Sequence, residues 1–104
     1  MSNLKIVSLN VNSFKSKIPI IKKLTENFDI IFLQEIMLLS EDLGLLGDVN
    51  DNFCYYAIPS VMSINNVGRP IGGLAVIFNK KLTPFIKINC ISINIMNVEL
   101  SFRN

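Results

Sequence analysis

The hydrophobic pattern begins with two short apolar runs that are typical of strands covered on both faces. Leu4–Val11 is a nearly continuous apolar stretch with β-branched residues, and Ile30–Gln34 is a second one. Between them, Ile18, Ile21 and Leu24 recur at helical spacing and predict an amphipathic helix. Strand, helix and strand within about thirty residues predict a βαβ-like unit.

Most of the remaining pattern indicates β structure. Ser40–Leu46 has the features of a short helix, but Phe53–Ile58 and Ile71–Asn79 each have the pattern of a buried strand. Farther along, the alternation of apolar positions changes phase at Ile91 and again at Met96. A shift of one residue swaps the buried face of a strand, so each change predicts a turn or a β-bulge.

The composition indicates a small and unusually apolar globular unit. The chain has 104 residues, of which 50% are hydrophobic and 17% are charged. Its mean hydropathy of +0.44 is high for a domain of this size, because small domains have too much surface to hide that much hydrocarbon. We therefore expect one domain or less, with an apolar surface that needs a partner.

Charge, cysteines and targeting signals narrow the class of protein further. The net charge of +2 is too small to argue by itself for a nucleic-acid partner. Cys54 and Cys90 lie far apart without metal-ligand spacing and are predicted to be buried thiols in a reducing compartment. No apolar run approaches the roughly 20 residues that span a membrane, and no secretory signal is recognisable at the N-terminus. We expect a cytoplasmic or nuclear protein that is neither secreted nor bound to a membrane.

Two of the predicted strands end in polar side chains that suit a phosphate or a divalent metal. Asn10 ends the first strand, with Asn12 shortly after it, and Glu35 follows the second. Carboxylate oxygens such as those of Glu35 are the ligands that Mg²⁺ prefers. Taken alone, Glu35 is better explained by a solvated strand end, and Asn12 can equally make a turn after the strand. A third segment leads from Gly72 and Gly73 directly into an apolar strand, which permits a bulge or a close approach of another segment.

Together and in this order, these segments resemble the endonuclease/exonuclease/phosphatase superfamily of deoxyribonuclease-I-like folds. Within it they look most like the endonuclease domain of non-LTR retrotransposons, including the stretch that runs from Gly68 to Phe78. The resemblance implies an α/β (α+β) fold, namely the N-terminal half of a four-layer αββα sandwich. That half would be a mixed β-sheet with one or two helices on one face and an apolar second face that needs a partner. The expected organisation is a partial domain over residues 1–104, truncated at the C-terminus.

The resemblance also implies roles for individual residues. Glu35 would be the principal ligand of Mg²⁺ and Asn12 a weaker one, while Asn10 would be catalytic by placing the scissile phosphate and the nucleophile. Arg69 would contact the phosphate of the substrate, although an ordinary surface arginine is an equal alternative. The implied substrate is DNA, and the implied activity of the complete domain is cleavage of phosphodiester bonds.

The chain departs from the family's pattern in ways that affect activity. Leu9, Ser13 and Ile36 stand where the family often has Trp, Gly and Thr. The family's later motifs, a catalytic tyrosine, an Asp-x-Asn pair and an Asp-His pair, have no counterpart after the two glycines, and the sequence contains no histidine. We therefore expect a truncated domain that is inactive alone, because such groups act as a unit. Two alternatives remain open: a half-domain completed by a second chain, and a non-catalytic interaction module.

Overall fold

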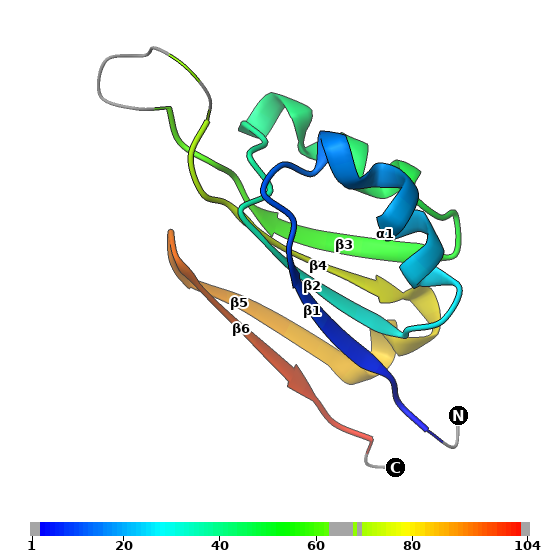
Figure 1. The fold of residues 1–104 in the computed structure, drawn as a ribbon. Coiled ribbons are helices and arrows are strands. Elements are labelled where there is room, and N and C mark those ends of the chain that lie inside the picture. The colour runs from blue at the N-terminus through cyan, green and yellow to red at the C-terminus, as the bar shows by residue number, and fades with distance from the viewer. Residues whose placement is uncertain (1–2, 63–67, 69, 103–104) are drawn as a thin grey trace.

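The computed structural model, which describes residues 3–62, 68 and 70–102, has three layers. A four-stranded sheet forms the middle layer, with helical segments on one face and a two-stranded β-hairpin on the other (Figure 1). The structure is thus a mixed α+β fold, and the predicted fold class is confirmed.

The central sheet contains four strands in the order β1-β2-β4-β3. Their bounds are Ile6–Asn10 for β1, Ile30–Gln34 for β2, Phe53–Ile58 for β3 and Leu74–Asn79 for β4. β1 and β2 are parallel, whereas β4 is antiparallel to both of its neighbours. Helix α1 (Ile18–Thr25) connects β1 to β2 after a short 3-10 turn over Lys15–Lys17, η1. The predicted βαβ-like unit is confirmed.

Two strands are shorter than predicted. β1 covers only the middle of the predicted Leu4–Val11 run. β4 does not extend to Ile71, which forms only an isolated bridge with Val61. Gly72 and Gly73 interrupt the strand because their φ angles of +77° and +91° lie outside the range of extended backbone.

Helix α1 and a longer 3-10 segment cover the face of the sheet on which the larger apolar core lies. Ile31 and Leu33 of β2 both point into this core, because alternate residues of a strand face the same side of the sheet. Ile21 of α1 and Leu46 of the 3-10 segment η2 (Ser40–Asp48) close it from the other side. The predicted helix over Ser40–Leu46 is therefore present, in the tighter 3-10 form.

The β-hairpin packs on the opposite face of the sheet. It consists of β5 (Ile86–Ser92) and β6 (Ile95–Leu100), which follow the 3-10 segment η3 (Lys80–Phe85). Apolar residues of both hairpin strands pack on the sheet residues Ile30, Val76 and Phe78: they are Ile86, Ile88, Met96, Val98 and Leu100. The second apolar face of the sheet, which was expected to need a partner, is thus covered in part by the chain's own hairpin.

Both predicted changes of phase correspond to features of this hairpin. The register of the two strands shifts between Cys90 and Ser92, as at a β-bulge. The chain then turns at Ile93 and Asn94 before β6 begins. Because the bulge and the turn each reset the alternation, the isoleucines at the tip of the hairpin point outward, and Ile91 is 64% exposed.

Two expectations about the environment of the chain can be compared with the structure. Among the described residues, no helix is long and apolar enough to cross a membrane. Both cysteines are free, but the prediction that they are buried is wrong, since Cys54 is half-buried and Cys90 is exposed. Cys90 lies directly before the bulge, and its Sγ donates to the carbonyl of Ser92 at 3.4 Å, so the thiol is held against the backbone of the hairpin.

Candidate functional site

The C-terminal ends of β1 and β2 meet at the same edge of the sheet because the two strands are parallel. Asn10 is the register partner of Gln34, and Glu35 follows directly. The Nδ2 group of Asn10 donates a hydrogen bond to Oε2 of Glu35. The backbone N–H of Asn12 donates to Oδ1 of Asn10 at 3.1 Å, which fixes the orientation of the amide. The structure therefore brings Asn10 and Glu35 into direct contact.

The side chain of Glu35 reaches solvent because the chain makes a bulge-like step at the end of β2. Leu33 points into the helix-side core, so Glu35 would point there too if the strand continued unbroken. Instead Glu35 adopts a φ of +53°, and Ile36 and Leu38 occupy the next core positions. The alternation thus shifts by one residue, and Glu35 is the extra residue. Bulges of this kind re-aim side chains and are common beside active sites.

Backbone strain is concentrated at this edge of the sheet. In the described part of the chain, the non-glycine residues with positive φ are Asn12, Ser13, Glu35 and Met37. Asparagine adopts this conformation readily, but for the others it costs on the order of 1–3 kcal/mol each. Such strain persists only where the surroundings impose it. Part of that constraint comes from Ser13, whose N–H donates to the carbonyl of Glu35 at 3.0 Å.

The two consecutive glycines constrain the segment after Glu35 from the other side. The carbonyl of Gly73 accepts from the N–H of Ile36 at 3.3 Å, and that of Gly72 accepts from Met37 at 3.0 Å. A Cβ atom on Gly73 would lie 2.6 Å from Cγ1 of Ile36, closer than real Cβ contacts allow. The close approach predicted for this pair of glycines is therefore confirmed.

The other predicted site residues are placed less directly. Asn12 takes part through its backbone, and among the described residues its side-chain amide makes no hydrogen bond with Glu35. Arg69 lies outside the described residues. The part of the chain that the structure describes contains no cluster of three or more His, Cys, Asp or Glu side chains suited to a metal.

The side chains that the structure places at this edge are one carboxylate and one amide, which is the smallest donor set that suits Mg²⁺. Glu35 is exposed and has no ion-pair partner among the described residues. The ion pair found in that part of the chain joins Lys15 and Asp42. Mg²⁺ is often held by only one or two carboxylates, with water and substrate phosphate as the remaining ligands. One carboxylate beside an oriented asparagine meets that requirement, provided that the substrate completes the site.

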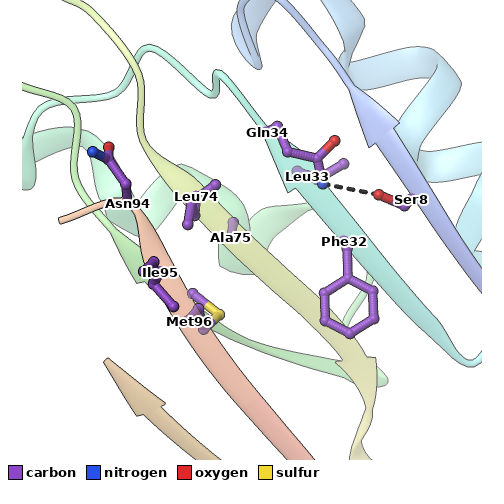
Figure 2. A pocket seen from close by; sticks show the side chains of 9 residues that line it. All are labelled: Ser8, Phe32, Leu33, Gln34, Leu74, Ala75, Asn94, Ile95 and Met96. Carbon is purple, nitrogen blue, oxygen red and sulfur yellow. Dashed lines mark hydrogen bonds between the residues drawn. The ribbon is translucent and has the colours of Figure 1, made fainter. Parts of the chain in front are cut away.

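A pocket of about 270 Å³ lies between the central sheet and the hairpin, and Gln34, the residue before Glu35, lines it (Figure 2). On its wall, Nε2 of Gln34 donates to Oγ of Ser8 at 2.9 Å, which leaves the hydroxyl proton of Ser8 and Oε1 of Gln34 for other partners. Asn94 contributes a further amide from the turn of the hairpin. The remaining lining residues are apolar and none is charged, so the pocket suits a neutral group better than a phosphate.

The sequence reasoning did not single out Ser8 or Asn94. A signal for Ser8 exists, because Ser8 and Asn10 are polar at alternate positions of an apolar strand and must therefore share a face. No comparable signal exists for Asn94, whose position depends on how the hairpin packs against the sheet.

The comparisons with known proteins do not relate this geometry to any of them. No protein-family model matches the chain, and neither a curated protein nor a solved structure matches it. A functional assignment therefore depends on the residues of the site.

Proposed function

We propose that this chain carries the metal- and phosphate-binding part of a Mg²⁺-dependent phosphodiesterase that acts on DNA. It would be the N-terminal part of an endonuclease/exonuclease/phosphatase domain. The observation that supports this most directly is the contact between Asn10 and Glu35 at the C-terminal ends of two parallel strands. The strained backbone that turns Glu35 out of the core gives the contact further weight, because strain of this kind is concentrated at functional sites.

The residues of the pair have complementary roles in this proposal. Oε2 of Glu35 accepts from Asn10, so Oε1 is the oxygen that would hold Mg²⁺. Asn10 uses one Nδ2 proton for Glu35 and keeps the second for a phosphate oxygen. Asn12 would be at most a weak additional ligand, and Arg69 would contact the DNA phosphate. When bound, Mg²⁺ would supply charge neutralisation at the phosphate and a more acidic water.

We propose further that the chain binds without cleaving when it is alone. The sequence contains no histidine and no aspartate after Asp51, so the later Asp-x-Asn and Asp-His pairs of the superfamily that it resembles have no counterpart. A metal ligand separated from its base and its transition-state donors retains little of the rate. Cleavage would then depend on groups that a second chain or a further segment brings to the Asn10–Glu35 pair.

Binding of Mg²⁺ is the direct test. We expect Mg²⁺ to raise the melting temperature of the protein, and the variant Glu35→Gln to lose this effect because the amide cannot replace the charged ligand. At ten times its dissociation constant, a ligand stabilises by about 1.4 kcal/mol. For a chain of this size that is roughly 6–11 °C in melting temperature, measured by circular dichroism.

A matched control separates the metal ligand from a general effect of charge. Glu26, an exposed carboxylate at the C-terminal end of α1, is replaced in Glu26→Gln, which should keep the full Mg²⁺ effect. Equal stabilisation of Glu35→Gln and the unmodified protein would show that the ligand assignment is wrong.

A second candidate is a protein-binding module, favoured by the exposed apolar tip of the hairpin. Ile91 and Ile93 are each 64% exposed and Ile95 is 53% exposed. A binding module predicts a folded chain whose stability does not respond to Mg²⁺.

A half-domain completed by a second chain predicts instead that plasmid DNA is nicked in the presence of Mg²⁺ by the complex but not by this chain alone. The substitution Glu35→Ala should abolish that nicking.

A further inference from the structure

Ser60 is a buried polar residue whose hydrogen bonds are directed at the segment that follows Glu35. Among the described residues, Ser60 and Thr25 are the polar side chains that are buried, and Ser60 is 5% exposed. The Oγ1 of Thr25 donates to the carbonyl of Lys22 and accepts from Nδ2 of Asn50 at 3.0 Å, so it ties α1 to the loop after η2 and not to the segment after Glu35. Ser60 lies beyond the end of β3 and bonds to residues that are distant in sequence.

Two hydrogen bonds link Ser60 to the segment after Glu35 and to the glycine that lies opposite it. Its Oγ donates to the carbonyl of Gly72 at 2.6 Å, and its N–H donates to the carbonyl of Leu38 at 2.7 Å. The same Gly72 carbonyl accepts from the N–H of Met37 at 3.0 Å. Ser60, Gly72, Met37 and Leu38 thus form a closed hydrogen-bonded unit, which we call the Ser60 clasp.

The Ser60 clasp is one of two constraints on the strained backbone at Glu35. On the side of β1, Ser13 donates to the carbonyl of Glu35 at 3.0 Å. On the side of β4, the clasp holds Met37, which also has a positive φ. A left-handed conformation at non-glycine residues is kept only when the neighbouring structure imposes it. Loss of the clasp would therefore let the residues after Glu35 relax.

We propose that Ser60 is a positioning residue for Glu35, acting through Gly72 and Met37 rather than by contact with metal or substrate. The inference rests on the function proposed above, in which Glu35 holds Mg²⁺ and Asn10 orients it. The packing beside the clasp supports it, because the Oγ of Ser60 would lie 2.5 Å from a Cβ atom on the neighbouring Gly73. Its hydroxyl thus fills the space that the glycine leaves open.

The test compares Ser60→Ala with Thr25→Val, which removes the other buried hydroxyl without changing the size of the side chain. The first readout needs no metal: it is the NMR shift of the Asn10 side-chain amide protons, one of which is donated to Glu35. We expect Ser60→Ala to move this resonance toward the value of a free amide, and to weaken Mg²⁺ binding on the order of fivefold, as for loss of one neutral hydrogen bond. Thr25→Val should change neither.

The outcomes separate this inference from the proposed function. If Ser60→Ala leaves the Asn10 resonance and the Mg²⁺ affinity as they are in Thr25→Val, Ser60 has only a structural role and the inference is overturned. If the unmodified protein binds no Mg²⁺, the proposed function fails, but the Asn10 resonance still decides whether Ser60 controls the Asn10–Glu35 pair.

If Ser60→Ala does not fold, hydrogen exchange of the unmodified protein decides. The inference then requires the backbone amide of Met37 to be protected as strongly as the amides of β4. Exchange of Met37 at the rate of an unfolded chain would overturn the inference.

Discussion

Replacing Gly73 with alanine should remove about 2–6 kcal/mol of stability, a large share of the total for a chain of this size. The new Cβ atom would lie 2.5 Å from Oγ of Ser60 and 2.6 Å from Cγ1 of Ile36. Neither can move aside cheaply, because Ser60 is hydrogen-bonded to Gly72 and Ile36 is fully buried. Overpacking costs about 1–3 kcal/mol, and a residue other than glycine at the φ of +91° adds about 1–3 kcal/mol of strain. Urea denaturation measures the loss.

Gly44 provides the matched control for this substitution. It lies in η2, no atom lies within 4 Å of its ideal Cβ position, and its φ is not positive. Gly44→Ala should therefore change the free energy of unfolding by less than about 1 kcal/mol. Equal losses in the two variants would mean that the packing around Gly73 is looser than described.

Phe14→Ala should cost about 3–5 kcal/mol, the usual range for deleting a buried aromatic ring from a core. The Phe14 side chain is fully buried in the helix-side core, and its N–H donates to the carbonyl of Ile36 at 2.9 Å. The ring thus anchors the chain directly after the strained residues Asn12 and Ser13. The free energy of unfolding in urea measures the effect.

Phe102 is the corresponding exposed aromatic residue. It is 54% exposed, and its ring centroid lies 5.3 Å from that of Phe85. An aromatic pair at the surface contributes about 0.5–1.5 kcal/mol, so Phe102→Ala should cost much less than Phe14→Ala. A loss of 3 kcal/mol or more in Phe102→Ala would contradict this account and point to a larger role for the hairpin face.

Local patterns predicted the elements well because the apolar runs have clear polar boundaries. β2 and β3 have the predicted bounds, Ile30–Gln34 and Phe53–Ile58. The period of 3.6 located α1, and the two phase changes located the bulge and the turn of the hairpin. These features depend on neighbours in sequence, which is why the sequence alone reveals them.

The pairing of distant strands was not accessible in the same way. Nothing local to β4 shows that it lies between β2 and β3, because all three runs are apolar and short. The covering of the second sheet face by the chain's own hairpin has the same cause. The bulge at Glu35, in contrast, left a readable signal: the core positions pass from Leu33 to Ile36, a step of three where a strand requires two.

The candidate site, too, could be predicted from the sequence only in part. The contact between Asn10 and Glu35 follows from two parallel strands whose ends carry polar residues, and the structure contains it. Their roles in binding phosphate and Mg²⁺, and the action on DNA, stay predictions. The Ser60 clasp could not be foreseen, since it joins three segments whose approach is set by the packing around Gly73.

The position of β4 in the sheet also determines when a nascent chain can complete its fold. β2 and β3 do not pair with each other. β4 lies between them and pairs with both. While residues 74–79 remain inside the ribosome, β2 can pair only with β1, and β3 has no strand partner. Unpaired apolar strands are the segments most prone to join other chains, and pairings distant in sequence form slowly. The sheet can therefore be completed only after β4 emerges from the ribosome. Until then its unpaired apolar strands are the segments that chaperones would need to shield.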